Sequence, residues 1–430
     1  MLLGEALELA HKQNSEVHLA HLKVNESDAK VTQARADYFP RVTNETNGLH
    51  LGEKERLTIP QGSLGTYPAD GAIPGKDVTI DLGKQNLIVS TTTAAQPLSQ
   101  LLKVHAGVQV ARADAAIARA DAKRAEDEIA LNVKKLYFSI LAMEKRAAAA
   151  RLRIQAGEEK IEEARNAVAA GAGLEVDVRS GEAEIAEARN ALGTLEDALA
   201  DARIELNDLL GLPLDTELEL LAPAGDEPAT ETMEHSFTAA STNLANTALV
   251  TNAFAHNPEL ASAQTTLIKA NAGLKAAKLE FVPDVSLFVE HVYQNGVPLL
   301  PENSYTAGVR VEWTLSEFGK RTGLIRERSA QVEQASTNLG IVEDRTRMDI
   351  AKARRKLDRS STALAAAQAA VDARAESRRV MSNQVEAKTA NPSALSDADA
   401  KLDEAQAQLL QTQMARAIAD AELERLSGDE

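Results

Sequence analysis

This chain contains two copies of one sequence pattern, and the duplication restricts its fold more than any other feature. Shifting residues 14–42 forward by about 243 positions, or residues 98–192 forward by about 217, aligns each segment with a second one without a gap. The matched positions include Asn14 with Asn257, Pro40 with Pro283, Lys103 with Lys320, Val133 with Ile350 and Leu192 with Leu409. The copies differ in length only between Pro40 and Leu98, where the first is about 26 residues longer.

The composition excludes several classes of protein. The chain has 430 residues, no cysteine and a net charge of −17. Without cysteine there is no disulfide framework and no thiolate metal site. An acidic chain whose basic residues are interleaved with acids does not suit a nucleic-acid surface. No run of about 18 apolar residues is present, so we expect no transmembrane helix. Residues 1–5 lack the basic and apolar parts of a signal peptide, so the chain is either cytoplasmic or the mature part of a processed protein.

Helices are expected over most of the chain. Two long arms contain no internal proline, are rich in Ala, Glu, Arg, Lys and Leu, and could each be roughly 100 Å long at 1.5 Å per residue. Glycine or proline ends each arm and starts a return helix, so each copy contains one long helical hairpin. The predicted helices before the arms are 2–13, 15–37, 245–256 and 258–280, the arms are 98–170 and 315–388, and the turns are 169–174 and 390–393.

Apolar residues in the first hairpin recur at the spacing of a coiled-coil seam. Ile129, Val133, Leu136 and Ile140 follow one another at intervals of four, three and four, and alanine fills the stripe between such anchors. Small residues let helices approach closely, so each helix can have a neighbour on two sides. A simple two-helix coiled coil is the alternative interpretation of this pattern.

Two short segments of the second copy have the alternation of a membrane-spanning strand. From Tyr305 to Leu315 apolar and polar residues alternate over the 9–11 residues that a tilted strand needs to cross a bilayer, and residues 285–293 form its expected partner. Tyr293, Tyr305 and Trp313 are candidates for an aromatic girdle. A soluble hairpin that covers a core is the alternative. In the corresponding strands of the first copy, residues 42–47 have few side chains suited to lipid, and residues 87–93 include β-branched residues but alternate poorly.

The repeat divides the chain into three parts. The first copy covers residues 1–211, with a β-hairpin at about 41–96 and a helical hairpin at about 98–210. A joining segment, residues 212–244, contains three prolines and a candidate strand at Thr216–Leu220, and we expect it to pack against the middle of the long helices. The second copy covers 245–427, with its β-hairpin at about 284–315 and its helical hairpin at about 316–427.

The order of elements resembles that of the TolC-like outer-membrane efflux proteins over nearly the whole chain. The matching features are Asn257-Pro258-Glu259-Leu260, the pairs Phe39-Pro40 and Val282-Pro283, the strand-to-helix segments at 96–98 and 313–319, and Leu210-Gly211-Leu212-Pro213. The resemblance implies a mainly helical fold with a small transmembrane β part: a homotrimer in which each chain gives four strands to one twelve-stranded barrel, continuous with an α-helical barrel in the periplasm. It also implies an exit duct of a tripartite efflux or type I secretion system, gated at its periplasmic tip and docked to an adaptor protein and an inner-membrane pump.

The resemblance suggests residues for the gate and for docking. Asp397 matches an aspartate at the tip of relatives, with Asp399 beside it and Asp177 at the equivalent place in the first copy, and these three are the candidates for an acidic pore constriction. The alternative is that each merely stabilises a helix N-terminus. The candidates for adaptor docking are Gly171, Ala172, Gly173, Leu174 and Lys388.

Other functions fit the sequence less well. Gly171-Ala172-Gly173 follows a helix and has no third glycine, which argues against a dinucleotide loop. His18 and His21 lie one turn apart without further ligands, so we expect no metal site, no cofactor and no enzyme activity. A periplasmic coiled-coil adaptor or scaffold is the alternative function. The cargo and the identity of the pump are left open.

Overall fold

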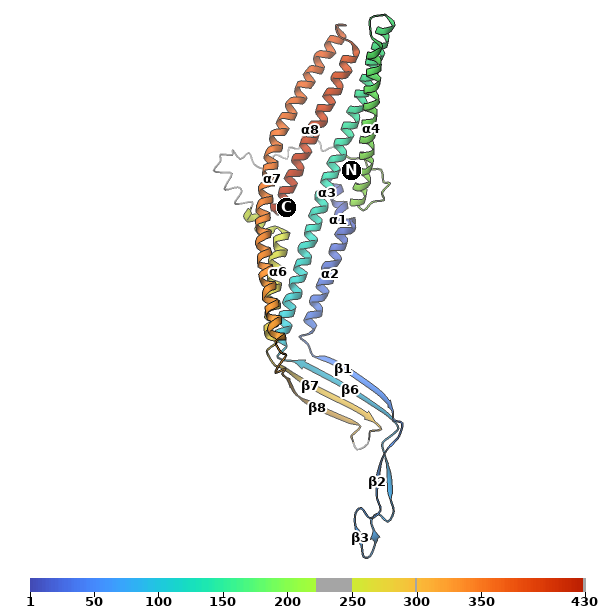
Figure 1. Cartoon of the computed structure of the whole chain (residues 1–430), viewed down its shortest axis with the longest axis vertical. Helices are drawn as coiled ribbons and strands as arrows, with labels where there is room; N and C mark the ends of the chain where they lie inside the picture. Colours follow the sequence, from blue (N-terminus) through green and yellow to red (C-terminus); the bar gives the residue numbers. More distant parts are fainter. Residues whose placement is uncertain (222–249, 298–299, 428–430) are drawn as a thin grey trace. The chain divides into compact units, whose positions relative to one another are not determined.

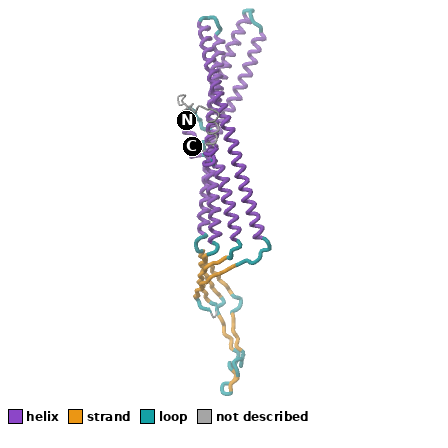
Figure 2. The backbone as a smooth tube through the Cα atoms, turned by 90° about the vertical axis from the view of Figure 1, so that its left-hand side faces the viewer, coloured by secondary structure: helices purple, strands orange, loops and turns teal. Residues whose placement is uncertain are grey.

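The computed structural model describes residues 1–221, 250–297 and 300–427, and it divides into two compact units. One unit consists of Met1–Glu26, Ala115–Thr266 and Ala335–Glu430 and is helical. The other consists of Ser27–Asp114 and Leu267–Gln334 and contains every described strand (Figures 1 and 2). Both units combine pieces of the two copies, so the repeat is visible along the sequence and not as two separate bodies. Most of the joining segment, residues 222–244, lies outside the described residues.

The long helices begin and end close to the predicted positions. The glycines and prolines at the turns set these limits, and the arms between them are unbroken. The helices are α1 (Leu3–Gln13), α2 (Ser15–Ala36), α3 (Leu101–Ala169), α4 (Glu175–Leu209), α6 (Pro258–Leu279), α7 (Lys320–Glu386) and α8 (Pro392–Ser427), and residues 250–256 are also helical. Within the described part of the chain, none of them is both long and apolar enough to cross a membrane.

The four longest strands form one antiparallel sheet in the order β1-β6-β7-β8. They are β1 (Arg41–His50), β6 (Asn86–Pro97), β7 (Asp284–Asn295) and β8 (Asn303–Glu312). Ten residue pairs join β6 to β7, from Ile88–Asn295 to Pro97–Ser286, so the sheet links the two copies. The first hairpin is longer than its weak alternation predicted, because neighbouring strands supply its backbone partners. In the second hairpin β7 is longer than predicted, whereas β8 begins two residues earlier than predicted and ends at Glu312, before Trp313.

The loop that lengthens the first copy also contains strands. Strand β2 (Glu55–Ile59) pairs with β5 (Val78–Leu82), and β3 (Thr66–Tyr67) pairs with β4 (Gly71–Ala72). The additional residues of the first copy therefore form a two-stranded ribbon, β2 with β5, which the sequence analysis did not predict.

The strand predicted at Thr216–Leu220 is wrong. No described strand lies beside these residues, so they have no ladder partner and use single hydrogen bonds instead. The amide of Leu221 donates to the carbonyl of Met1, and the hydroxyl of Tyr137 donates to the carbonyls of both Met1 and Leu221. Leu220 is buried in the main hydrophobic cluster, as expected for a segment that packs against the helices.

The hydrophobic core of the helical unit follows the predicted seam. Ile129, Val133 and Ile140 are buried, and together with Leu206 and Leu210 they form the main cluster with residues of α1. A second cluster lies toward the turn of the first hairpin and contains Ile154, Ile161, Val178 and Ile185. The main cluster joins α1, α3 and α4. The alternative of a simple two-helix coiled coil therefore does not describe this core.

Candidate functional site at the helical turns and the charge-free sheet face

The two hairpin turns have the same backbone geometry. Gly171 has φ of 72°, and Lys388, its equivalent in the second copy, has φ of 57°. The amides of both residues donate to the carbonyl three residues earlier, Val168 in one turn and Val385 in the other. The left-handed region costs a residue with a side chain roughly 1–2 kcal/mol, so the second turn adopts this conformation at a cost that glycine avoids. The repeat is therefore retained in the turn even where its glycine is not.

The first turn presents exposed apolar side chains. Leu174 is 66% exposed and Val176 is 63% exposed, beside the turn residues Gly171 to Gly173. Asp177 is also exposed, and it lies in the first turn of α4, where a negative charge is favourable. This position does not distinguish a pore role for Asp177 from stabilisation of the helix N-terminus, and Leu174 is accessible for contact with another protein.

Glu163, near the end of α3, caps the start of α8. Its carboxylate accepts hydrogen bonds from the hydroxyl of Ser393 at 2.7 Å, from the amide of Asn391 at 3.3 Å and from the backbone N–H of Ser393 at 3.4 Å. Ser393 is buried. A carboxylate at a helix N-terminus satisfies free N–H groups and interacts favourably with the helix dipole. One side chain of the first hairpin therefore holds the turn of the second.

Further contacts between the same helices surround this cap. Glu159 accepts from the hydroxyl of Ser396 at 2.6 Å, and Lys160 lies 3.4 Å from the carboxylate of Asp397. We call the group Glu159, Lys160, Glu163, Asn391, Ser393, Ser396 and Asp397 the latch, because it connects the two hairpins next to their turns.

Two of the three predicted pore aspartates, Asp397 and Asp399, are paired within the chain. Asp397 contacts Lys401 at 2.6 Å as well as Lys160, and Asp399 contacts Arg378 at 2.5 Å. The hydrogen bond from Lys401 holds the pKa of the Asp397 carboxyl below its usual value. Burial opposes this effect, and the charge of Lys160 lowers the pKa by a smaller amount. Asp397 is therefore ionised at neutral pH and is part of the latch.

Sequence reasoning missed the α3 side of the latch. Glu159 and Glu163 lie within three turns of the C-terminus of α3, among other carboxylates with the same local surroundings, so the sequence around them gives no signal that sets them apart. Their partners could not be identified from spacing, because they lie more than 200 residues away in the sequence.

The four-stranded sheet has two faces of different character. Because alternate residues share a face, the pairing fixes which side chains lie together. One face carries Arg41, Glu45, Asp284, Glu290, Arg310 and Glu312. The other, which we call the charge-free face, has no Asp, Glu, Lys or Arg on any of the four strands. Its β7–β8 half is apolar, with Val285, Leu287, Val289, Ala307, Val309 and Val311.

The β1–β6 half of the charge-free face is polar but internally hydrogen-bonded. The amide of Asn44 donates to the hydroxyls of Ser90 and Thr92, and the hydroxyl of Thr46 bonds both Asn44 and Ser90. The polar residues that make the first hairpin look unsuited to lipid in the sequence are the ones that form these hydrogen bonds. These polar side chains are hydrogen-bonded to one another, and polar groups need such partners in surroundings that contain no water.

The predicted girdle residues lie toward the two ends of the second hairpin. Tyr305 is 77% exposed and stacks on His291 across the strands, with ring centroids 4.6 Å apart, and Tyr293 pairs with Asn303 at the same end. Trp313 follows the last residue of β8 at the opposite end and is exposed. The aromatic side chains therefore border the apolar half of the charge-free face at both ends.

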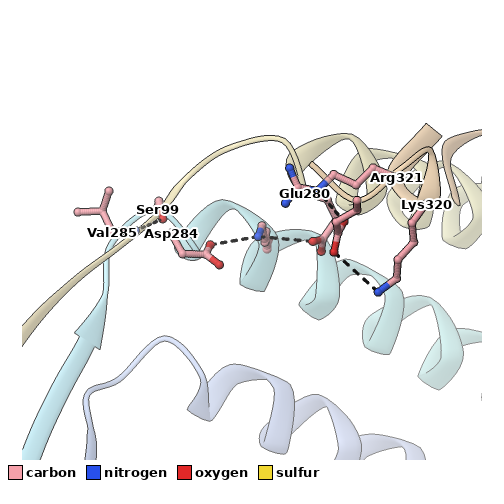
Figure 3. A network of polar contacts seen from close by, with 8 residues as sticks. Ser99, Glu280, Asp284, Val285, Lys320 and Arg321 are labelled. Atoms are coloured by element: carbon pink, nitrogen blue, oxygen red, sulfur yellow. Dashed lines mark hydrogen bonds and ion pairs between the residues drawn. The ribbon is translucent and has the colours of Figure 1, made fainter. Parts of the chain in front are cut away.

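Polar contacts tie the start of the second hairpin to the start of α3. The hydroxyl of Ser99 accepts from the backbone N–H of Val285 at 2.8 Å, and Lys103 contacts Asp284 at 3.1 Å and Glu280 at 3.9 Å (Figure 3). On α7, Arg321 lies 3.0 Å from Glu317, which also contacts Lys320 in the same view. These bonds fix where the strand begins relative to the first turn of the helix.

Comparison with solved structures shows which proteins share this fold. CusC, described as forming a transmembrane channel, superposes with a TM-score of 0.76 at 15% identity, covering 100% of this chain and 92% of its own. VceC, an outer membrane protein of Vibrio cholerae, gives 0.73 at 16%, covering 99% and 96%. The open MtrE outer membrane channel of Neisseria gonorrhoeae gives 0.71 at 17%, covering 99% and 88%. At these identities the likeness concerns the fold.

The sequence itself identifies the family. The model of the outer membrane efflux protein family matches residues 6–212 and 249–429, and the chain belongs to this family. The resemblance noted from the sequence is thereby confirmed, and so is a role in transport rather than catalysis. A comparison with curated protein sequences found no match.

Proposed function

We propose that this protein is the exit duct of a tripartite efflux or type I secretion system, a passive conduit across the outer membrane that is gated at the turns of its helical hairpins. The observation that carries the proposal is the sheet. It combines one charge-free face with two edges, β1 and β8, each of which pairs with a single strand among the described residues. An edge of ten residues exposes a row of backbone groups that needs a partner.

A second copy of the chain supplies that partner. Because neighbouring strands of the sheet alternate in direction, β1 and β8 run in opposite directions, and β8 of one copy can continue the antiparallel sheet with β1 of the next. Such a head-to-tail contact generates a closed ring. Three copies give the homotrimer and the twelve-stranded barrel that the family resemblance implied, with an even number of strands. The charge-free face then meets lipid, and the charged face lines the interior.

The dimensions of the second hairpin suit a membrane. Tyr305 and Trp313 are eight residues apart, which is about 27 Å along a strand and roughly 20 Å in height for a strand tilted by 35–45°. The apolar band of an outer-membrane barrel is about 25 Å tall and is bordered by aromatic residues on both sides. The aromatic pair thus supports an outer-membrane location, with the helical unit extending into the periplasm.

In this proposal the gate is closed when the contacts of the latch are formed. Breaking the contacts of Glu163 and Glu159 would weaken the attachment of the second turn to the first hairpin. The adaptor docks at the turns, where Leu174 and Gly171 are exposed and where Lys388 is the equivalent position of the second copy. Asp397, Asp399 and Asp177 would supply the acidic constriction, and the inner-membrane pump would deliver the cargo.

Single-channel recording in a planar bilayer tests the conduit and the latch together. The wild-type protein should give small, stable, cation-preferring steps. Glu163→Gln, which weakens the cap on α8, should give larger or more frequent openings. Glu158→Gln is the matched control, because Glu158 contacts Arg189 within the first hairpin and lies outside the latch. Asp397→Asn should reduce cation preference. No steps from any variant, with protein that is soluble without detergent, would instead favour a periplasmic adaptor or scaffold.

A further inference from the structure

The ribbon formed by β2 and β5 has one apolar and one polar face. Its register pairs Leu57 with Ile80 and Ile59 with Val78, and Leu82 lies opposite Glu55 on the same side. We call the side chains of Leu57, Ile59, Val78, Ile80 and Leu82 the ribbon apolar face. Five apolar side chains on one side of so short a ribbon form a surface that favours removal from water.

The opposite side of the ribbon is built for contact with water. Thr58 and Thr79 are hydrogen-bonded to each other at 3.2 Å, and Arg56 donates to Asp81 at 3.1 Å. These side chains are exposed and satisfy one another across the two strands. The contrast between the faces therefore follows the alternation of the strands and gives the ribbon a definite inner and outer side.

Within the chain, the ribbon apolar face is left partly uncovered. Leu57 is 48% exposed and Ile80 is 43% exposed, although they are cross-strand partners at the centre of the ribbon. An isolated two-stranded ribbon is marginally stable in water, and stability normally requires a further surface against its apolar side. We therefore expect another surface to pack against the ribbon apolar face.

The connection of the ribbon to the sheet favours another copy of the same chain as the source of that surface. The ribbon continues from β1, which is the edge strand at the proposed contact between copies, and it returns into β6. Any ring closed through β1 and β8 therefore brings identical ribbons to the same end of the sheet. This argument depends on the ring of the proposed function.

Charge argues against a lipid headgroup as the partner of this face. The charged side chain on the apolar side of the ribbon is that of Glu55, whereas an anionic headgroup would require lysine or arginine there. Arg56, the basic residue of these strands, lies on the polar side and is paired with Asp81. A second ribbon, which presents the same apolar side chains, is the better match.

We propose that the ribbon apolar faces of neighbouring copies pack against one another, forming a contact between chains that is separate from the β1–β8 contact. The contact lies at the end of the strands away from the helices, since β1 leaves α2 at its other end. In the assembled duct, this contact sits on the outer side of the membrane and limits how far the ribbons separate there.

Single cysteines test this contact directly, because the chain contains none of its own. In the assembled protein, Leu57→Cys and Ile80→Cys should each give inter-chain cross-links with a short bis-maleimide. Thr58→Cys and Thr79→Cys are the matched controls on the polar side of the same ribbon and should give at least tenfold less cross-linked product. The same two controls should react at least tenfold faster with a membrane-impermeant maleimide.

The outcomes separate this contact from the ring on which it rests. An intact oligomer in native mass measurement, with equal and rapid labelling of both sides and no cross-link, would overturn the ribbon contact alone. So would a fluorophore at Leu57→Cys that is quenched by brominated lipids, because the apolar face would then lie in the bilayer. A monomer in the same mass measurement would overturn the ring together with the inference.

Discussion

Asn14 and Asn257 occupy the same position in the two copies and make the same hydrogen bonds. The side-chain oxygen of Asn14 accepts from the backbone N–H groups of Glu16 and Val17, and that of Asn257 accepts from those of Glu259 and Leu260. Each amide nitrogen also donates to the last turn of a returning helix, to the carbonyl of Leu209 in the first copy and to that of Leu426 in the second. Each asparagine therefore caps one helix and ties it to the end of another.

Replacing either asparagine should lower the free energy of unfolding. Both side chains are buried, so Asn14→Ala or Asn257→Ala leaves N–H groups and a carbonyl without partners, at a cost of about 1–3 kcal/mol. Thermal unfolding followed by circular dichroism in detergent would measure the loss. Asn271→Ala is the control, since Asn271 is exposed on α6 and bonds only its own helix. Equal stability of all three variants would contradict the conclusion that Asn14 and Asn257 each connect two helices.

Gly211 follows the end of α4 and lies close to Gln13, next to the contacts of Asn14. Its φ of 68° is in the left-handed region, and a Cβ on it would lie 2.6 Å from the carbonyl oxygen of Gln13. Gly211→Ala should therefore reduce the free energy of unfolding by more than about 1 kcal/mol. Gly193→Ala on α4 is the matched control, because that site is open and should gain up to about 1 kcal/mol from helix propensity. Denaturant titration of both variants would measure opposite signs, and two equal losses would argue against the close approach.

The latch should respond to pH through Asp397. Its pKa is lowered chiefly by the hydrogen bond from Lys401, so its contribution to stability is complete above the unfolded value, near 3.8, and is lost as pH falls through the lower folded value. Asp397→Asn should thus be less stable than wild type at neutral pH, with the difference shrinking below about pH 4. The side chain is 37% exposed, so the difference should be small and should fall with added salt. Unfolding measured from acid to neutral pH tests this, and a difference independent of pH would exclude it.

The charge-free face should reject a charge where it meets lipid. Val309 pairs with Leu287 near the centre of the second hairpin. Val309→Arg should cost roughly 2–4 kcal/mol if this position lies near the middle of the bilayer. Thr306→Arg, on the charged face of the same strand, is the control and should be tolerated. Folding into lipid vesicles, followed by heat-modifiable mobility on gels, would separate the two, and equal tolerance would mean that the face does not contact lipid.

Much of the architecture could be predicted from the sequence because its signals are local. Pro40 and Pro283 mark the ends of helices, and the alternation from Tyr305 onward marks a strand, since each acts on its own neighbourhood. The repeat then extended these assignments from one copy to the other. The prediction at Thr216–Leu220 was wrong for the complementary reason. Its alternation is local, whereas a strand needs a partner that the pattern does not reveal.

The latch could not be predicted, because it depends on how two long helices are rotated relative to each other. Glu163 and Ser393 meet only when both hairpins have formed, and many carboxylates of α3 have the same local surroundings. The pairing of Asp397 could be predicted in part, since Lys401 lies one helical turn away in the sequence. Its second partner, Lys160, comes from the other hairpin and carries no signal near Asp397 in the sequence.

The β6–β7 pairing also bears on how such a chain could have arisen. Each copy contributes one β-hairpin and one helical hairpin, and within the chain the hairpin of one copy already adjoins that of the other through ten antiparallel residue pairs. The proposed β8–β1 contact has the same form. A gene encoding half of this chain would therefore give subunits that meet the same kind of neighbour on both sides. Fusing two such genes would then allow the halves to diverge, as Gly171 and Lys388 have done at the same bend.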